Sequence, residues 1–208
     1  VREDPILKML VVSLTCYGMA TVEGPMLSLK NVNAYSHYTD WTVAHVHIGA
    51  LGFNGFMIFA MLYYLVPRMW NTELHSRKLA NIHFLIGTVG ILLYAIPMYW
   101  AGWAQSLMWK KFTDSGQLQY QFLETVTNIV PMYLVRAIGG TLYWIGGFLA
   151  AYNLAKTIKN GSFVDNEPAE AVPLSAQAMP SGKLHWHTAI ERRPVQLLIF
   201  SFVVVAIG

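Results

Sequence analysis

The sequence predicts an all-α integral membrane protein. Hydrophobic residues make up 55% of the 208 positions and charged residues 12%, about half the charged share of a typical soluble domain. Four apolar runs each reach the roughly 20 residues that a helix needs to cross a bilayer core. Their hydrophobic residues do not alternate with polar ones as barrel strands do, so we expect the spans to be helices.

The four predicted spans follow one another along the chain and are separated by polar or charged residues. They cover residues 6–29, 42–66, 81–107 and 129–155. A fifth apolar run, 195–208, holds 14 residues and is too short to cross. Because residue 1 is Val and the fifth run stops early, we expect a part of a longer protein.

The predicted organisation has three parts. Residues 1–159 form transmembrane helices, and residues 195–208 begin an additional transmembrane helix. Between them, residues 160–194 form a flexible cytoplasmic linker, because most of this stretch is rich in Pro, Ala, Ser and acidic residues with little bulk.

Charge and cysteine content exclude several classes of site. Cys16 is the only cysteine, which excludes a disulfide framework, a Cys-ligated iron–sulfur cluster and a Cys-x-x-Cys-His haem attachment site within this chain. The net charge of +3 is modest, and no basic patch interleaved with aromatic residues suggests a nucleic acid partner.

Basic and aromatic residues predict the orientation of the spans. Four spans put the N-terminus, the 67–80 loop and the segment after residue 156 on one side, which carries most of the Lys and Arg and is therefore cytoplasmic. Aromatic residues collect at both boundaries, as interfacial belts do. The outer belt includes Tyr35, Tyr38 and Trp41, and the inner belt includes Tyr63, Tyr64 and Trp70.

The second span carries two histidines, His45 and His47, separated by one valine. Helix positions i and i+2 point about 200° apart and differ by only ~3 Å in height, so the two imidazoles leave opposite sides of one helix. Such a pair suits two separate cofactors, and haem is the cofactor most able to use one axial histidine inside a membrane. Gly49 and Gly52 lie at i+4 and i+7 from His45, which predicts a bare face for a flat ring.

Two further ionisable residues lie near the depth of this pair. His45 is expected roughly 6 Å below the outer boundary, and Glu23 and Arg136 each roughly 10 Å below it. Glu23 could accept the second N–H of a haem-ligating histidine, and Arg136 could neutralise a haem propionate. The alternative is a structural ion pair between Glu23 and Arg136. His83 lies at a different depth, near the cytoplasmic start of its span, and is expected to be structural or interfacial.

Three segments carry a family resemblance: VEGPM at 22–26, NVNAYSHYTDWTVAHVHIGALGFNGFMIFAMLYYLVPRM at 31–69, and AIGGTLYWIGGFLAAYN at 137–153. They resemble the catalytic subunit I of cbb(3)-type cytochrome c oxidases, the C-type haem-copper oxygen reductases. The resemblance covers about residues 1–160. It implies that the spans are the last four helices of a twelve-helix core in a bacterial inner (plasma) membrane.

The resemblance also implies roles for individual residues. His45 corresponds to the proximal ligand of the high-spin haem b(3), and His47 to one axial ligand of the low-spin haem b. Glu23 resembles the acidic residue that is hydrogen-bonded to the proximal histidine. His37 and Asn33 resemble loop residues that contact haem propionates at the outer surface.

As a whole, such an enzyme takes electrons from cytochrome c, reduces oxygen to water at a haem b(3)–CuB centre and pumps protons. The ligands of CuB, the active-site tyrosine and the second ligand of the low-spin haem are expected before residue 1. This chain would therefore be active only with the N-terminal half of subunit I. The other implied partners are membrane-anchored c-type cytochrome subunits, cytochrome c, oxygen and the lipid bilayer.

The tail leaves two possibilities open. His185 and His187 repeat the His-x-His spacing in a polar segment, where a surface role is expected. The apolar run after them resembles the membrane anchor of the mono-haem cytochrome c subunit, which some members carry fused to subunit I. The alternative is one additional helix of subunit I with no cytochrome c domain.

Two other functions compete with the oxidase. A nitric oxide reductase large subunit also keeps a His-x-His helix with two b-type haems, but uses a non-haem iron with acidic residues. A non-catalytic, haem-free membrane bundle would use the buried polar residues only to pair its helices.

Overall fold

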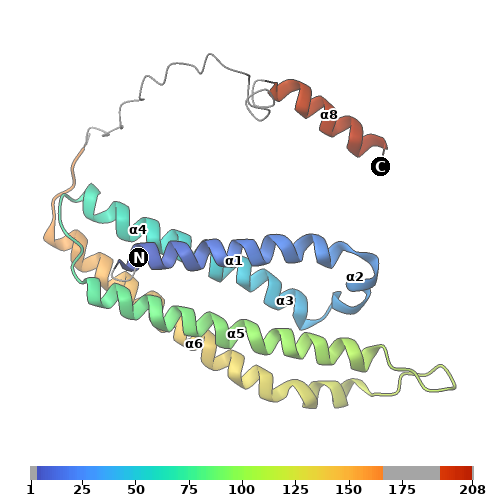
Figure 1. The fold of residues 1–208 in the computed structure, drawn as a ribbon. Helices are drawn as coiled ribbons and strands as arrows, with labels where there is room; N and C mark the ends of the chain where they lie inside the picture. Colours follow the sequence, from blue (N-terminus) through green and yellow to red (C-terminus); the bar gives the residue numbers. More distant parts are fainter. Residues whose placement is uncertain (1–3, 166–192, 208) are drawn as a thin grey trace. The chain divides into compact units, whose positions relative to one another are not determined.

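The computed structural model of this chain describes residues 4–165 and 193–207 (Figure 1). The chain divides into two units, Val1–Glu167 and Pro168–Gly208. In the described residues, four spans are long and apolar enough to cross a membrane: Pro5–Ser28, Asp40–Met69, Arg77–Trp109 and Phe122–Asn160. The predicted all-α membrane fold is therefore confirmed.

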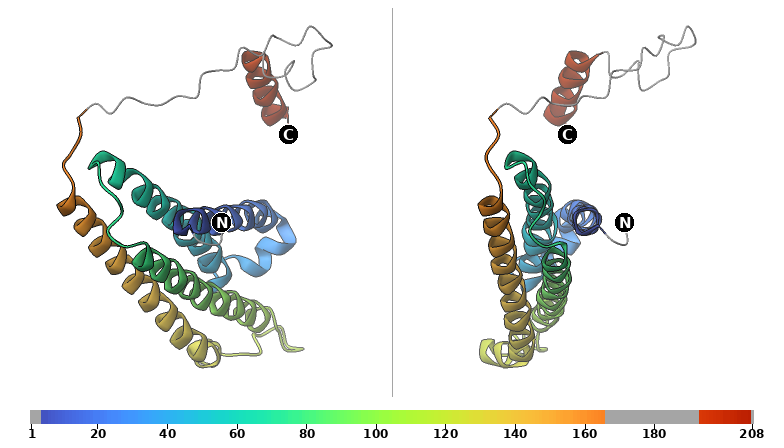
Figure 2. Two further views of the ribbon diagram at one scale, coloured as in Figure 1. Left: turned by 60° about the vertical axis from the view of Figure 1, so that its left-hand side comes forward. Right: turned by 90° about the vertical axis from the view of Figure 1, so that its left-hand side faces the viewer.

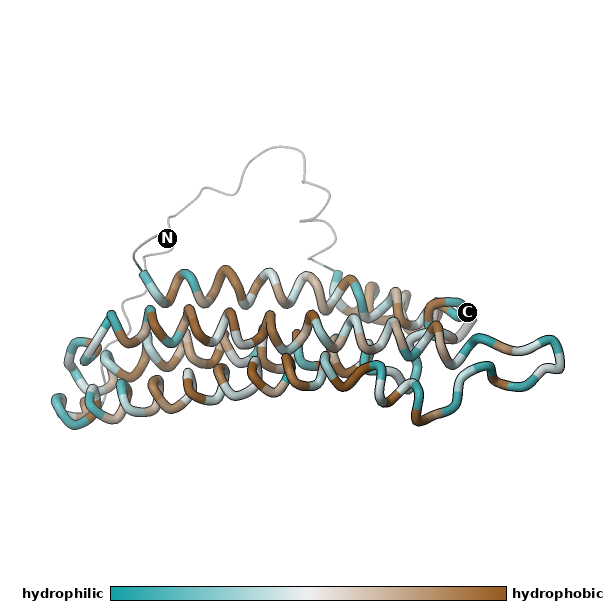
Figure 3. The backbone as a smooth tube through the Cα atoms, turned by 90° about the horizontal axis from the view of Figure 1, so that it is seen from below, coloured by the Kyte–Doolittle hydropathy of each residue, from teal (hydrophilic) through white to brown (hydrophobic). Residues whose placement is uncertain are grey.

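The first unit contains most of the helices. They are α1 (Pro5–Ser28), α2 (Lys30–Ser36), α3 (Asp40–His47), the π-helix η1 (Ile48–Gly55), α4 (Phe56–Met69), α5 (Arg77–Trp109) and α6 (Phe122–Asn160). Segments α3, η1 and α4 follow one another without a break and form the second span. Figure 3 shows apolar residues along the spans and polar residues gathered at their ends and in the loop between α5 and α6.

The second span lies between α1 and the pair formed by α5 and α6. It packs against α1 through η1 and α4, and against α5 through α3. Helices α5 and α6 run side by side along most of their lengths (Figures 1 and 2). Helix α3 itself packs mainly against α5 and more lightly against α1, so its residues have a different neighbour on each side.

Two helices start earlier than their apolar runs predict because polar residues cap them. The Ser76 hydroxyl accepts the backbone N–H of Leu79 and begins α5 before residue 81. Gln121 and Glu124 form a capping box that begins α6 at Phe122, ahead of the predicted residue 129. The outer connection is correspondingly shorter than expected, and Phe112 and Leu118 pair across it in an isolated antiparallel bridge.

The middle of the second span is a π-helix, which the regular helical spacing did not predict. A π-turn is wider than an α-turn, and such segments are frequent at functional sites. Hydroxyl groups from two neighbouring helices bond its carbonyls: Ser13 donates to Phe53 O at 2.9 Å, and Tyr143 donates to Leu51 O at 2.9 Å. Packing from α1 and α6 therefore stabilises η1, which starts directly after His47.

The predicted bare face beside His45 is wrong at both glycines. A Cβ on Gly52 would lie 2.7 Å from Cys16 Sγ, and one on Gly49 would lie 3.8 Å from the Ala20 side chain. Helix α1 fills this face, so the glycines allow a close helix contact rather than leaving room for a ring.

The interfacial assignment of Tyr63 is also wrong. Tyr63 is 2% exposed and its hydroxyl lies 3.1 Å from Nδ1 of His83, which is 1% exposed. The ring of Phe59 packs edge-on against the His83 imidazole at 4.5 Å. Of the two roles expected for His83, the structural one is confirmed and the interfacial one is wrong.

The second unit is described only by helix α8, Pro194–Ile207. It covers most of the apolar run 195–208, where the start of a further transmembrane helix is predicted. The greater part of the predicted linker, together with His185 and His187, lies outside the described residues.

Candidate functional site

The candidate site is built around α3, the short helix that carries both histidines. Thr39 caps its N-terminus, where the hydroxyl accepts the Trp41 backbone N–H at 3.3 Å. His45 contacts α1, whereas His47 contacts α5. The two imidazoles therefore leave α3 toward different neighbours, as their spacing predicts.

On the α1 side, His45 bonds to Glu23. Its Nδ1 lies 3.2 Å from Glu23 Oε2, and the two side chains are 22% and 11% exposed. Because a carboxylate accepts hydrogen bonds, the proton of the neutral imidazole lies on Nδ1, and the lone pair of Nε2 is free for a metal.

On the α5 side, His47 is held in the same tautomer by its own helix. Its Nδ1 donates to the Val43 carbonyl at 2.8 Å. Its Nε2 accepts a hydrogen bond from the Tyr94 hydroxyl at 3.1 Å, and the two rings stack with centroids 4.6 Å apart. Metal binding at this Nε2 requires the Tyr94 hydroxyl to turn away.

An open groove lies on each side of this arrangement. One, of about 530 Å³, is lined by α1 residues, Glu23 among them, and by Tyr99 of α5. The other, of about 460 Å³, is lined by Tyr94 together with Arg136 and neighbouring residues of α6. Glu23, the partner of His45, and Tyr94, the partner of His47, thus each line a groove, although neither histidine lines one itself. Imidazoles whose Nδ1 atoms are already hydrogen-bonded fit axial ligation of haem through Nε2.

Arg136 lies on the His47 side of the site. Its guanidinium carbon is 4.5 Å from the centre of the Tyr133 ring and 5.9 Å from that of Tyr94, and Nη1 lies 3.4 Å from Met98 Sδ. The alternative, an ion pair between Glu23 and Arg136, is wrong. Glu23 pairs with His45 on one side of α3, whereas Arg136 packs against tyrosines on the other side.

Asn33 and His37 lie apart from these contacts, on and just after α2. The Asn33 amide donates to Leu27 O at 3.1 Å, which ties α2 to the end of α1. The His37 ring packs against Tyr38 at 4.0 Å. Both side chains are exposed, and the structure does not bring either into contact with His45 or His47.

Two of the three residues that bond to Glu23, Trp41 and Tyr99, were not predicted from the sequence. Trp41 Nε1 donates to Oε1 at 2.6 Å, and the Tyr99 hydroxyl donates to Oε2 at 2.6 Å. Trp41, predicted as an interfacial aromatic, is half-buried and also stacks on the exposed Trp103, with ring centroids 6.0 Å apart. Tyr99 comes from a helix more than 50 positions later in the chain, and no local pattern marks it.

A buried polar cluster at the outer end of α3 was missed as well. Gln105 donates to Asp40 Oδ2 at 2.9 Å and accepts the Asp40 backbone N–H at 2.7 Å. The Tyr133 hydroxyl donates to the same carboxylate oxygen at 2.7 Å. These bonds join the start of α3 to α5 and α6, and so hold the histidine helix in place.

Fold and site together define a class of protein: a multi-pass helical membrane protein in which one helix presents two imidazoles, prepared as metal ligands, to opposite sides. The comparisons with known proteins agree. The family model for cytochrome c and quinol oxidase polypeptide I matches residues 1–142. This chain belongs to that family, whose haem-copper chemistry implies haem and copper as cofactors.

The similar proteins include cytochrome c oxidase subunits. The bacteroid cytochrome c oxidase subunit 1 homologue of Bradyrhizobium diazoefficiens is 51% identical over 173 residues, which are 83% of this chain and 32% of the relative. The cbb3-type subunit CcoN1 of Stutzerimonas stutzeri is 48% identical over 159 residues, 76% of this chain and 34% of the relative. This chain therefore spans about a third of the length of these curated relatives.

Two further similarities are more distant, one in structure and one in sequence. A haem-copper terminal oxidase dimer, solved by cryo-electron microscopy, matches with a TM-score of 0.60 at 19% identity, over 77% of this chain and 28% of that one. A nitric oxide reductase polypeptide of Stutzerimonas stutzeri is 23% identical over 138 residues, 64% of this chain and 29% of the relative. The cbb3-type and bacteroid cytochrome c oxidase subunits, at 48% and 51% identity, are more similar to this chain than the nitric oxide reductase is. The resemblance to cbb(3)-type cytochrome c oxidases is confirmed.

Proposed function

We propose that this chain supplies one side of the oxygen-reducing centre of a respiratory cytochrome c oxidase. In this proposal His45 is the proximal ligand of the high-spin haem b(3), and His47 is an axial ligand of the low-spin haem b. The observation that carries the proposal is that both imidazoles have the same tautomer. Glu23 and the Val43 carbonyl each hold a proton on Nδ1, so Nε2 is the atom that would bind iron in both residues. At His47 the iron would replace the hydrogen bond from the Tyr94 hydroxyl.

The chain's own contribution is position. Because His45 and His47 differ by two residues, one short helix holds both imidazoles at nearly the same depth. The cluster around Asp40 and the bond from Glu23 then restrain that helix on both sides. When bound, the two haems would supply electron transfer and an iron with an open position for oxygen.

Charged and polar groups of the outer half would complete the haem sites. Arg136 lines the groove on the His47 side, so its guanidinium is a suitable partner for a propionate. Asn33 and His37 are exposed on the outer loop, and we propose them as further propionate contacts once the whole subunit is assembled.

The rest of the centre would come from outside this chain. Among residues 4–165 and 193–207, no group of three or more His, Cys, Asp or Glu side chains could hold a metal ion. We therefore propose that the CuB ligands, the active-site tyrosine and the second ligand of the low-spin haem belong to the N-terminal part of subunit I. The complete enzyme would reduce oxygen to water and pump protons.

The assembly and its orientation are part of the same proposal. Cytochrome c would deliver the electrons, as the names of the relatives suggest. Membrane-anchored c-type cytochrome subunits are the further partners that the family resemblance implies. The complex would lie in a bacterial inner membrane with the N-terminus and the 160–194 linker in the cytoplasm, because basic residues are concentrated there.

The reduced optical spectrum of the purified complex tests the ligand assignment. His45→Ala should remove the high-spin haem signal and His47→Ala the low-spin signal, while His75→Ala, an exposed histidine in the loop before α5, should keep both. Added imidazole should restore the high-spin signal in His45→Gly, which separates lost ligation from misfolding. Unchanged haem signals in all variants would refute the proposal.

The same spectrum addresses the two competing functions. A haem-free bundle predicts no b-type haem signal in the complete complex. For a nitric oxide reductase, metal analysis should find non-haem iron in place of copper, and the sequence before residue 1 should carry glutamates around an iron site. The oxidase instead predicts copper, three copper-type histidines and a nearby tyrosine.

A further inference from the structure

The carboxylate of Glu23 is shared among three donors from two other segments. Tyr99 OH lies 2.6 Å from Oε2, Trp41 Nε1 lies 2.6 Å from Oε1, and His45 Nδ1 lies 3.2 Å from Oε2. Tyr99 and His45 thus bond to the same oxygen, and the tyrosine makes the shorter contact. Trp41 occupies the other oxygen.

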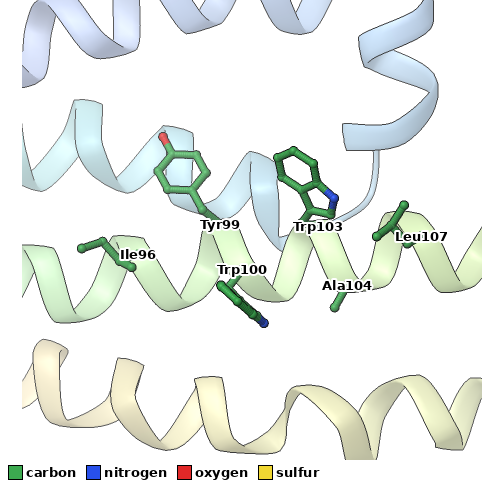
Figure 4. A pocket seen from close by; sticks show the side chains of 6 residues that line it. All are labelled: Ile96, Tyr99, Trp100, Trp103, Ala104 and Leu107. Carbon is green, nitrogen blue, oxygen red and sulfur yellow. The ribbon is translucent and has the colours of Figure 1, made fainter.

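Tyr99 reaches Glu23 from a separate element. It projects from α5 toward α1, whereas Trp100 beside it points the other way (Figure 4). The Glu23 side chain is 11% exposed, and hydrogen bonds are electrostatically stronger in such a low-dielectric environment than in water. Removal of one donor therefore changes how strongly Glu23 accepts from those that remain.

The sharing has a consequence for the ligand. A carboxylate that accepts from the Nδ1–H of a metal-bound histidine makes that histidine a more basic ligand. A second donor to the same oxygen draws electron density from it and weakens its bond to the imidazole. We propose that Tyr99 is a positioning residue that acts through Glu23 to limit the basicity of His45. This inference rests on the proposed role of His45 as a haem ligand.

Trp41 provides a contrast within the same site. It lies four residues before His45 on α3 and bonds to Oε1, so it orients the carboxylate without competing for the oxygen that His45 uses. Loss of the Tyr99 hydroxyl should therefore strengthen the Glu23–His45 bond, whereas loss of the Trp41 N–H should mainly loosen the carboxylate. If Tyr99 only held α1 and α5 together, loss of its hydroxyl would not strengthen the Glu23–His45 bond.

The test uses Tyr99→Phe in the complete oxidase complex. Resonance Raman spectroscopy of the reduced enzyme reports the iron–histidine stretch of the high-spin haem, and a redox titration reports its midpoint potential. We expect Tyr99→Phe to raise the stretching frequency and lower the potential. Trp41→Phe should shift both less, or in the opposite direction. Tyr63→Phe, which instead removes a buried hydroxyl that contacts the structural His83, should shift neither.

Glu23→Gln separates the possible failures. If it lowers the stretching frequency while Tyr99→Phe leaves frequency and potential at the wild-type values, the tuning role of Tyr99 is overturned and the ligand assignment stands. If Glu23→Gln and His45→Ala both leave the high-spin haem signals unchanged, His45 is not the ligand and both proposals fail.

Discussion

Substitution of Gly139 by Ala should separate α5 from α6. A Cβ at Gly139 would lie 2.6 Å from Gly90 O, and equally close to the Leu93 carbonyl carbon and Tyr94 N. Ordinary contact begins at 3.4 Å, so the helices must move apart by the difference, about 0.8 Å. All three atoms are backbone, and a side-chain rotation cannot relieve the overlap.

The cost follows from two opposing effects. Overpacking of a well-packed interior costs about 1–3 kcal/mol, and replacing Gly by Ala inside a helix returns up to about 1 kcal/mol. We therefore expect a net loss of up to roughly 2 kcal/mol against the wild type, and a loss of about 1–3 kcal/mol against the same Gly-to-Ala change at an uncrowded helix position. The local shift should also disturb the bond from Tyr94 to His47, because the backbone of Tyr94 is one of the contacts.

The assay is thermal unfolding of the detergent-solubilised complex, followed by far-UV circular dichroism. Gly147→Ala is the matched control, since it makes the same change on the same helix at a position where a Cβ meets nothing within 4 Å. It should be neutral or slightly stabilising. If Gly139→Ala unfolds at the same temperature as Gly147→Ala or above it, the backbone contact between α5 and α6 does not exist.

Three further substitutions test single contacts by the same unfolding assay. Ser76→Ala removes the N-cap of α5 and should cost about 1 kcal/mol, while Ser76→Asp should restore most of it. Gln105→Leu leaves the buried Asp40 without both amide bonds and should cost about 1–3 kcal/mol. Tyr143→Phe deprives Leu51 O in the π-helix of its donor and should cost about 1 kcal/mol. Unfolding temperatures equal to the wild-type value would show, in each case, that the bond does not contribute.

Composition and periodicity predicted the four spans because the bilayer imposes a simple requirement of length and polarity. They also predicted the direction of His45 and His47, since positions two residues apart on an α-helix face opposite ways. The exact ends were missed where a cap outweighed hydropathy, as at Gln121 and Glu124. The ends of a helix depend on a few polar capping residues, and a search for apolar runs does not take these into account.

The partners of each buried polar group were harder to predict. Glu23 and Arg136 had similar predicted depths, yet Glu23 bonds to Tyr99 and Trp41 while Arg136 packs on Tyr133. Depth specifies only one coordinate of a side chain, and the rotation of each helix about its axis decides which groups meet. Depth alone left both an ion pair with Arg136 and a bond to a histidine open for Glu23, and the family resemblance favoured His45.

Local sequence was sufficient for the features that one segment creates alone: the membrane spans and the two imidazoles that face apart. Packing between distant segments decided the rest. The π-helix depends on hydroxyls of Ser13 and Tyr143, and the close approach of α1 closed the face beside Gly52. These contacts join residues tens of positions apart, where no periodicity connects them, and only the folded arrangement brings Tyr99 to the carboxylate that holds His45.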